Sequence, residues 1–375
     1  MSQYKLEGCR LEIGPPCEVD RRAGHCWFSN LHRIGKDDLL CGTTLADDKA
    51  QGEWASALCR SKDGGRSWKC AGEACYGPAS VLLSSGKLLM MPYELWPLTK
   101  GERRNAKANG TIVARKPDGS IAFEREPVKF LGWPRDLADY NVDELCMVTN
   151  GNIFPLRDGR LFMTTYGRFQ GEEKYCVFAV TSADGGLTWN YLSTVARWQD
   201  TPDASEGPDE SNSARLPGGR LLCVYRVGSG QDFHKSYSAD EGVTWTKPER
   251  MNGVWSVEPQ LACLENGLLL LSGGRPGLYL WVCADRNGGK WEHVNLAEHH
   301  NALVSDASMR YPDEHVQGKY AEPAQSTSYT GMALVGPDEV LVSYDRLGNG
   351  WAGAPGPWGE KDAIFCVRVK AERKS

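Results

Sequence analysis

The sequence predicts an all-β fold, a six-bladed β-propeller of four-stranded antiparallel blades that uses the whole chain, residues 1–375, as a single domain. Three observations lead to this prediction: a repeated aspartate-containing turn, a second repeat of hairpins, and a composition rich in turn formers and tryptophan. Repeats spaced by some tens of residues are typical of propellers and solenoids. They override the two or three domains that chain length alone would indicate.

The first repeat is a turn of the form Ser-x-Asp-x-Gly-x-Ser/Thr-Trp, called the Asp-box turn below. Clean copies occupy residues 61–68, 182–189 and 238–245, and a degraded copy occupies residues 283–291. We expect the Asp carboxylate to accept N–H bonds inside the turn, Gly to supply a positive φ, and Trp to pack beneath the loop. Such a turn holds a hairpin together, so it specifies fold and carries no chemistry.

The second repeat counts the blades. A turn that feeds a strand with a pair of large apolar residues occurs six times, at residues 35–40, 85–89, 158–162, 218–222, 266–270 and 337–341. Each copy follows an apolar run, as in a β-hairpin. About four short strands per copy fill the chain, which predicts six blades.

Composition agrees with this fold and limits the partners. The chain has 42 Gly, 20 Pro and 13 Trp, which indicates many tight turns and packed aromatic rings. A formal net charge of -5 gives no sign of a nucleic-acid partner or of binding to an anionic membrane. Because no run of 18 apolar residues occurs, a membrane span is not expected.

The cysteines favour neither disulfides nor a metal. There are 13 of them, an odd number, without a Cys-x-x-Cys motif. Cys176, Cys223, Cys263 and Cys366 lie in apolar strands, where free cysteine behaves as a small hydrophobic residue, so no disulfide framework, zinc site or cofactor is predicted. The first residues form no apolar signal stretch, which makes a cytoplasmic location the simpler expectation, although a secreted protein with its signal removed would begin alike.

Asp-box turns on a six-bladed propeller resemble the sialidase (neuraminidase) superfamily, and the resemblance covers nearly the whole chain. It implies an exo-glycosidase that releases terminal sialic acid or a related acidic sugar with retention, through a tyrosine nucleophile and without cofactor or metal. The implied partner is a glycan with a terminal acidic sugar. Proteins with other activities also carry the turn, so each site residue has to be matched individually.

The best local match is the segment of residues 210–226. Sialidases carry a Glu before an inner strand, a Leu-Pro-x-Gly-Arg-Leu hairpin, and an Arg at the end of the next strand. The resemblance implies that Glu210 polarises the nucleophile, and that Arg226 and Arg275 hold the substrate carboxylate through planar, two-pronged hydrogen bonding. From the residues alone, a solvated acid and surface arginines stay open.

Tyr329 matches the nucleophilic tyrosine of the family, one hairpin before the end of the ring. A neutral phenol is a poor nucleophile unless a base takes its proton, which is the task that the resemblance gives to Glu210. A tyrosine suits a sugar whose anomeric carbon bears a carboxylate, because a carboxylate nucleophile would approach against like charge. An aromatic core residue is the alternative for Tyr329.

The general acid of the family lies in a loop of the first blade, where this chain has Asp47, Asp48 and Glu53. We prefer Asp48, with Asp47 and Glu53 as alternatives beside plain surface charge. An acid must be protonated near neutral pH, so burial or a nearby carboxylate has to raise its pKa.

One member of the family pattern is missing. Sialidases open the first inner strand with Phe/Tyr-Arg-Ile-Pro, whose Arg completes the carboxylate clamp, whereas residues 25–30 of this chain contain no Arg and Arg33 lies too close to the hairpin. Either another cation such as Arg346 completes the clamp, or the ligand is not an ordinary sialic acid. His25 and Trp27 would then offer a hydrogen-bonding and stacking wall to a different sugar.

Two other functions stay open on these grounds. One is a propeller glycoside hydrolase or polysaccharide lyase for uronate-containing or rhamnose-containing glycans, with His25 or a channel tyrosine transferring the proton. The other is a carbohydrate-binding propeller without turnover. Glu210 and Tyr329 at two strand starts favour the sialidase-like enzyme, and the missing arginine favours the other hydrolase or lyase.

Overall fold

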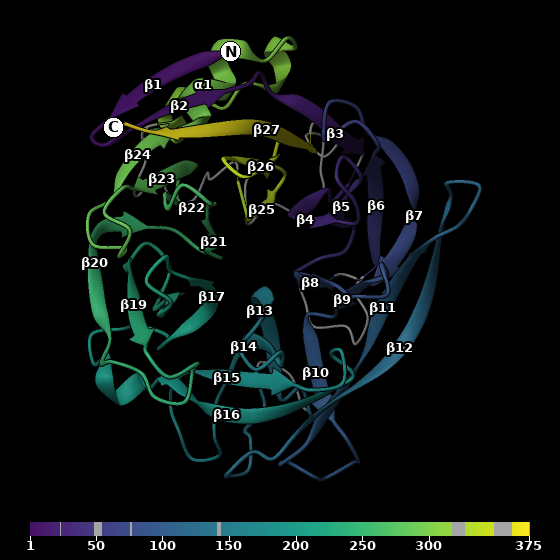
Figure 1. The fold of residues 1–375 in the computed structure, drawn as a ribbon, viewed down its shortest axis with the longest axis vertical. Coiled ribbons are helices and arrows are strands. Elements are labelled where there is room, and N and C mark those ends of the chain that lie inside the picture. The colour runs from purple at the N-terminus through teal and green to yellow at the C-terminus, as the bar shows by residue number, and fades with distance from the viewer. Residues whose placement is uncertain are drawn as a thin grey trace.

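The structure is a computed structural model that describes residues 1–22, 24–48, 55–75, 77–140, 144–316, 327–348 and 362–374. Six blades of β-sheet surround a common axis (Figure 1). This arrangement confirms the six-bladed propeller that the repeats predict.

Five of the blades follow one another along the chain, each with four principal strands. Blade 1 contains β4 (Trp27–Arg33), β5 (Leu39–Thr44), β6 (Ala55–Ser61) and β7 (Lys69–Cys75); blade 2 contains β8 (Ala79–Leu82), β9 (Leu88–Met91), β11 (Ala106–Arg115) and β12 (Ile121–Leu131); blade 3 contains β13 (Met147–Pro155), β14 (Leu161–Gly167), β15 (Cys176–Ser182) and β16 (Thr188–Ala196); blade 4 contains β17 (Asp209–Arg215), β18 (Leu221–Arg226), β19 (Asp232–Ser238) and β20 (Glu249–Trp255); blade 5 contains β21 (Gln260–Cys263), β22 (Leu269–Gly273), β23 (Tyr279–Cys283) and β24 (Glu292–Asn295). The first strands of blades 2 to 5, β8, β13, β17 and β21, contact one another in this order around the axis.

Blade 6 joins the two ends of the chain. It contains β25 (Thr330–Leu334), β26 (Glu339–Arg346) and β27 (Asp362–Arg373), and the N-terminal strands β2 (Cys9–Ile13) and β3 (Cys17–Arg22) both pair with β27. Strand β1 (Ser2–Leu6) adds to β2 at the outer edge. The ring is therefore closed by hydrogen bonds between strands from opposite ends of the sequence.

Blades 2 and 3 are merged into one sheet. Strand β12 pairs in parallel with β16, and the short strand β10 (Glu94–Pro97) bridges β11 and β13. In Figure 1 the long pair β11 and β12 extends beyond the other blades. The repeats do not predict this merger, because they mark turns and not lateral pairing.

Both sequence repeats occupy fixed positions in the blades. The six predicted hairpins join the first and second strands of the six blades, and the Asp-box turns join the third and fourth strands of blades 1, 3, 4 and 5. In the turn of residues 182–189, the Asp184 carboxylate accepts the backbone N–H groups of Leu187 and Thr188 at 3.1 and 2.9 Å. Trp189 is fully buried and donates its indole N–H to the Gly186 carbonyl. The local roles expected of the turn are thus confirmed.

The two repeats meet across the blade boundaries. A Cβ placed on Gly186, in the Asp-box turn of blade 3, would lie 2.5 Å from Cδ2 of Leu89, in the second strand of blade 2. The same contact joins each of the other Asp-box turns to the second strand of the preceding blade: Gly242 to Phe162, Gly288 to Leu222, and Gly65 to Leu341. The last of these spans the seam between blades 1 and 6.

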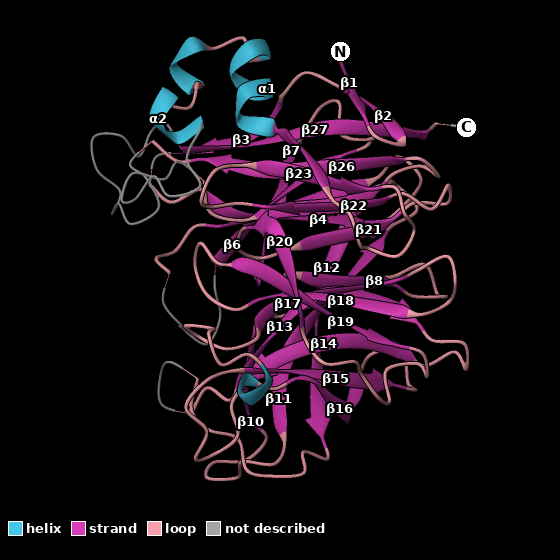
Figure 2. Cartoon of the chain, turned by 90° about the vertical axis from the view of Figure 1, so that its left-hand side faces the viewer, coloured by secondary structure: helices cyan, strands magenta, loops and turns pink. Residues whose placement is uncertain are grey.

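A helical connection between blades 5 and 6 was not predicted. It carries α1 (Leu296–Leu303) and α2 (Asp313–Val316), and Asn295 caps α1 by accepting the N–H groups of Ala297 and Glu298. Figure 2 shows both helices on one side of the strands of blade 6. In the described part of the chain, no helix is long and apolar enough to cross a membrane. Two 3-10 turns, Trp198–Asp200 and Ala307–Met309, complete the helical structure of the described residues.

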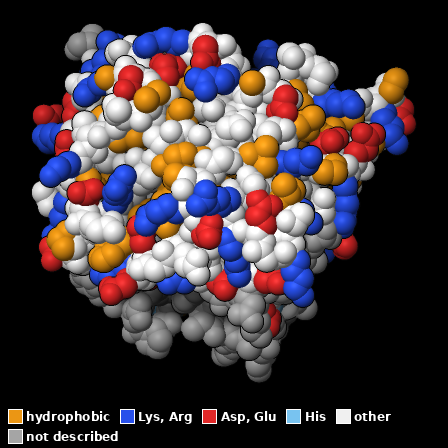
Figure 3. Space-filling view, turned by 90° about the horizontal axis from the view of Figure 1, so that it is seen from below, with side chains coloured by type: hydrophobic (Ala, Val, Ile, Leu, Met, Phe, Trp, Pro, Cys, Tyr) orange, Lys and Arg blue, Asp and Glu red, His pale blue; other side chains and the backbone are white. Residues whose placement is uncertain are grey.

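Most of the cysteines in the described part of the chain are buried, and the surface carries charges of both signs. Cys176, Cys223 and Cys366 are buried, and Cys263 is partly buried. On the face drawn in Figure 3, Lys and Arg side chains alternate with Asp and Glu, and hydrophobic side chains form only small groups among the described residues.

We expect Gly186→Ala to destabilise the protein by about 1–3 kcal/mol more than Gly185→Ala, because overpacking costs that much in a close-packed interior. Both glycines have positive φ, so both variants share the backbone strain, but a Cβ on Gly185 meets no atom within 4 Å. Chemical denaturation of the two variants measures the difference. Equal losses would mean that the contact with Leu89 does not hold the blades together.

Candidate active site

The candidate site lies where the first strands of the blades begin. Glu210 begins blade 4 and Tyr329 immediately precedes blade 6, as the sequence predicts, while Glu258 occupies the corresponding place in blade 5. The ladder between β17 and β18 contains a bulge between Asp209 and Ser211, which leaves Glu210 as the extra residue. Bulges commonly redirect a side chain beside an active site. Hydrogen bonds bring these residues from three blades together.

Glu210 is the acceptor that joins the three blades. Its Oε1 atom accepts the Tyr329 hydroxyl at 2.5 Å and Nη1 of Arg226 at 2.8 Å, and its Oε2 atom accepts the backbone N–H of Glu258 at 2.8 Å. The side chain is only 3% exposed. Burial acts to raise the pKa of Glu210, but the charges of Arg226 and Arg275 and the Tyr329 hydrogen bond outweigh it, so the pKa lies below its ordinary value. Glu210 is therefore an ionised base in contact with a phenol.

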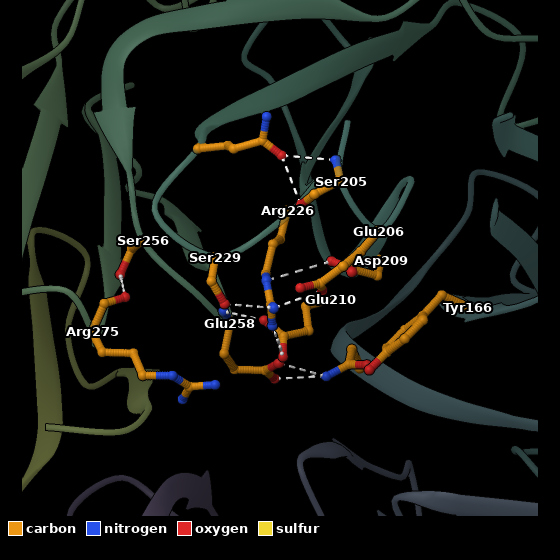
Figure 4. Close-up of polar contacts among 12 residues, drawn as sticks. Tyr166, Ser205, Glu206, Asp209, Glu210, Arg226, Ser229, Ser256, Glu258 and Arg275 are labelled. Carbon is orange, nitrogen blue, oxygen red and sulfur yellow. Dashed lines mark hydrogen bonds and ion pairs between the residues drawn. The ribbon is translucent and has the colours of Figure 1, made fainter. Parts of the chain in front are cut away.

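Arg226 is surrounded by carboxylates. Besides Glu210, its guanidinium binds Glu206 at 2.7 Å and Ser229 at 2.9 Å through Nη2, and Nε lies 4.0 Å from an oxygen of Asp209. Figure 4 shows these groups converging on the guanidinium. Burial raises the pKa of Asp209 well above its ordinary value, against the attraction of Arg226. The ion pairs with Glu206 and Glu210 therefore offset the positive charge of Arg226 within the protein.

Arg275 reaches the site through a close approach of two backbones. A Cβ on Gly274 would lie 1.8 Å from the Ser328 carbonyl oxygen, so only glycine fits before Arg275. The Arg275 N–H then donates to that carbonyl at 3.2 Å. Its guanidinium carbon lies 5.2 Å from the centre of the Tyr329 ring, within the range of a cation–π contact, and Figure 4 shows the guanidinium directed toward Glu258.

Tyr329 has charged groups of both signs around its ring. Burial and the neighbouring carboxylate of Glu210 raise the pKa of Tyr329 well above its ordinary value, while Arg275 acts to lower it. The phenol is therefore neutral at rest and donates its proton toward Glu210. This hydrogen bond is a direct path for proton transfer between the phenol and the carboxylate.

Phe28 comes from the segment of residues 25–30, where the resemblance places the missing arginine, and it lies against Tyr329. Its backbone has a φ of +52°, its N–H donates to the buried Asp345 carboxylate at 3.0 Å, and its ring centre lies 4.6 Å from that of Tyr329. Trp27 stacks on both Phe28 and His25, donates to the Ala46 carbonyl, and is 5% exposed. Trp27 therefore lies behind the site, where it supports Phe28 and offers little surface to a sugar.

The two candidate acids have different surroundings. Oδ1 of Asp47 lies within hydrogen-bonding distance of Nε2 of His25, at 2.8 Å. The side chain of Asp48 is exposed to solvent. Partial desolvation nevertheless raises its pKa; the charge of Arg275 acts to lower this pKa, and the charge of Glu210 acts to raise it. These influences place Asp48 electrostatically within the site, as a protonatable acid should be. Glu53 lies outside the described residues.

Arg346, which the sequence suggested as a third member of the carboxylate clamp, contacts a backbone carbonyl. It donates to the Arg310 carbonyl through Nε and Nη2, at 3.2 and 2.8 Å, and is 7% exposed. These contacts tie the end of β26 to the connection between blades 5 and 6. They give Arg346 a structural role, and its described hydrogen bonds do not extend the pair of Arg226 and Arg275.

Sequence reasoning missed Glu258 and Asn150. Glu258 is 3% exposed, and Nδ2 of Asn150 lies 2.7 Å from each of its carboxyl oxygens. Burial, then the adjacent charge of Glu210, raises the pKa of Glu258 to about 8. The sequence signal for Glu258 was its position: it lies two residues before the first strand of blade 5, and Glu210 lies at the start of the first strand of blade 4.

A group of tyrosines was also missed. The hydroxyls of Tyr93 and Tyr140 lie 3.1 and 2.8 Å from that of Tyr166, and the Tyr93 ring packs beside Trp27 and Phe28. These phenols give blades 2 and 3 a polar side facing the site. Among the described residues, no group of three or more His, Cys, Asp or Glu side chains is arranged to hold a metal ion.

Comparison with solved structures relates the fold to several propellers. An unknown-function protein from Dyadobacter fermentans matches with a TM-score of 0.65 and 17% identity, over 98% of this chain and 100% of that one. An α-L-arabinanase from Penicillium chrysogenum matches with a TM-score of 0.59 and 14% identity, over 96% and 98% of the two chains. A sialidase from Trypanosoma rangeli matches with a TM-score of 0.56 and 14% identity, over 93% of this chain and 55% of that one.

These identities establish a shared fold with glycosidase propellers and leave the substrate open. A sequence comparison with curated proteins finds no match. The family described as BNR repeat-like domain matches residues 132–324, which is just over half of the chain. The match includes three of the four Asp-box turns, the degraded one among them, as well as Glu210, Arg226 and Arg275. The chain therefore belongs to the BNR repeat-like domain family.

Proposed function

We propose that the protein is a retaining exo-glycosidase in which Tyr329 attacks the anomeric carbon and Glu210 takes the phenol proton. The observation that carries this proposal is the 2.5 Å hydrogen bond from the Tyr329 hydroxyl to a buried, ionised Glu210. A phenol becomes an effective nucleophile when a base accepts its proton as the bond forms. The similarity in fold to sialidases and arabinanases supports a glycan substrate.

The reaction proceeds in two balanced steps. In the first, Tyr329 bonds to the anomeric carbon, its proton passes to Glu210, and Asp48 donates a proton to the departing glycosidic oxygen. In the second, Asp48 accepts a proton from water as the water displaces Tyr329, and Glu210 returns the proton to the phenolate. Two displacements on one carbon retain the configuration.

The substrate that fits this pair best is a terminal sialic acid or a related acidic sugar. A carboxylate beside the anomeric carbon disfavours a carboxylate nucleophile and favours a neutral phenol. Arg275, which lies over the Tyr329 ring, is the cation that we assign to the substrate carboxylate. Arg226 contributes mainly by fixing Glu210, since three carboxylates already surround it.

A second candidate is a hydrolase or lyase for a glycan with another terminal sugar, such as a uronate or rhamnose. Two observations favour it: Phe28, from the segment where the resemblance places the first arginine, lies against Tyr329, and Glu206 and Glu210 offset the charge of Arg226 within the protein. The tyrosine hydroxyls of blades 2 and 3 would suit a sugar recognised through its own hydroxyls.

We expect hydrolysis of an aryl sialoside by the wild type and a loss of at least about 100-fold in kcat for Tyr329→Phe, in the range of a removed proton-transfer partner. Tyr344→Phe is the matched control, because Tyr344 is a buried tyrosine of the same blade whose hydroxyl contacts His300. Parallel assays on arabinosides, uronides and rhamnosides separate the two candidates. Activity on one of those alone would replace the acidic sugar.

Asp48→Asn is expected to lower kcat/KM for an alkyl glycoside by about 100-fold or more, and kcat/KM for an activated aryl glycoside much less, because kcat/KM reports the first step and a good leaving group needs no proton there. The kcat for both substrates should fall, because Asp48 also takes a proton from water in the second step. In the wild type the rate should fall as pH rises through the raised pKa of Asp48, and the variant should lose this dependence. Initial rates across pH measure both effects. A larger loss of this kind in Asp47→Asn would transfer the role to Asp47.

A further inference from the structure

Carboxyl groups outnumber guanidinium groups in the candidate site. Glu206, Asp209 and Glu210 surround Arg226, and Glu258 lies next to Glu210. Arg275 is the second guanidinium whose charge acts on these groups. An unpaired charge buried at this depth is costly, so a carboxyl without a cationic partner takes up a proton instead.

Glu258 is the carboxyl of this group that is 3% exposed and makes no ion pair within 4.0 Å among the described residues. The amide of Asn150 donates to its two oxygens and acts to lower its pKa, but this uncharged donor does not outweigh burial and the Glu210 charge. Glu210, in contrast, accepts a guanidinium and a phenol. Its backbone has a φ of +47°, which is rare for a glutamate, and this conformation directs its N–H to Oε2 of Glu210. Glu258 therefore acts on Glu210 through its main chain and presents its side chain to Asn150.

We propose that Glu258 is a positioning residue of this site, whose backbone N–H fixes Glu210 and whose side chain stays protonated so that Glu210 is the ionised carboxylate in contact with Tyr329. The effect of Glu258 on catalysis rests on the proposed function. The protonation of Glu258 is independent of that function and can be measured without a substrate.

The charged groups around Glu258 explain why its protonation matters. It faces Glu210 of β17, Arg226 of β18, Arg275 after β22, Tyr329 before β25, and the Asn150 amide of β13. A negative Glu258 would oppose ionisation of Tyr329 and would repel a substrate carboxylate approaching Arg275. The burial and the Glu210 charge that raise its pKa to about 8 keep the side chain neutral below that pH.

Glu258→Gln tests the protonation directly, because glutamine imitates a protonated glutamate in size and polarity. Glu241→Gln is the matched control: Glu241 is also a left-handed glutamate, with φ of +61°, but its hydrogen bond from Arg215 lowers its pKa to about 2. The infrared difference spectrum of the wild type minus Glu258→Gln near pH 6 should contain a carboxylic acid C=O band, and that of the wild type minus Glu241→Gln should contain none. Other buried acids with raised pKa values, such as Asp209 and Asp345, are present in all three proteins and cancel in the difference. A difference spectrum for Glu258→Gln without this band would overturn the proposal, whatever the activity.

The pH dependence of folding stability is a second test of the protonation of Glu258. A carboxyl whose pKa is raised by folding binds more protons in the folded state, so its contribution to stability falls as pH rises from the unfolded value of about 4.5 to about 8. The melting temperature of Glu258→Gln should therefore gain on that of the wild type between pH 5 and pH 8. For Glu241→Gln the difference in melting temperature from the wild type should stay constant between pH 5 and pH 8. The pKa of Glu241 lies below pH 5 both in the unfolded chain, at about 4.5, and in the folded protein, at about 2. A constant difference for Glu258→Gln would contradict the protonated state.

The pH profile separates positioning from a purely structural role. On a substrate identified under the proposed function, loss of the Glu258 proton should lower wild-type kcat/KM as pH rises through about 8, so the ratio of Glu258→Gln to wild-type kcat/KM should rise between pH 6 and pH 9. The ratio removes the dependence on Asp48, which both proteins share. An inactive Glu258→Gln with normal stability would make Glu258 a proton donor instead. Absence of glycosidase activity together with the infrared band would refute the proposed function and leave the assignment of the proton intact.

Discussion

The contact between an Asp-box glycine and the second strand of the preceding blade is the constraint on which this propeller depends. It is short because no Cβ intervenes, as at Gly186 against Leu89, and it recurs at the seam where Gly65 meets Leu341. This repeated contact sets the positions of blades 1, 3, 4 and 5 relative to the blade before each of them. Because blades 4 and 5 are fixed in this way, and the Gly65 contact holds blade 6 against blade 1, Glu210, Glu258 and Tyr329 meet near the axis.

The charges and hydrogen bonds around Glu210 and Glu258 determine which of the two is ionised. Arg226 and the Tyr329 hydroxyl stabilise the ionised form of Glu210, while Glu258 faces a neutral amide. Two glutamates a single hydrogen bond apart are thus driven to opposite protonation states by their surroundings, a pattern typical of sites that transfer protons. Arg275 over the Tyr329 ring is the cation of this group that is placed to meet an anionic substrate.

Local sequence signals predicted most of the fold, because an Asp-box turn or a hairpin is complete within a few residues. Pairing between distant strands was not predictable in this way: β2 and β3 complete blade 6, and β12 joins β16, without any motif that marks the partner. Helix α1 has eight residues, too few for a clear helical period.

In the site, matching to a family motif located Glu210, Arg226, Arg275 and Tyr329, which the structure brings together, and it favoured Asp48 over Asp47. It did not locate Glu258, because its left-handed backbone and its contact with Asn150 depend on a neighbouring blade. Nor did it distinguish an aromatic ring that faces a ligand from one that supports another ring, as with Trp27 behind Phe28. The same limit applies to Arg346, whose partner is a carbonyl of a connection that no motif predicted.

Trapping of the glycosyl-enzyme intermediate tests the central claim most directly. The protein would be incubated with an activated, fluorinated analogue of an acidic sugar that forms the covalent intermediate and hydrolyses slowly, and then digested for peptide mass mapping. The account predicts one added sugar on Tyr329, absent from Tyr329→Phe. A sugar attached to Glu210 or Glu258 would contradict it and would establish a carboxylate nucleophile in this propeller.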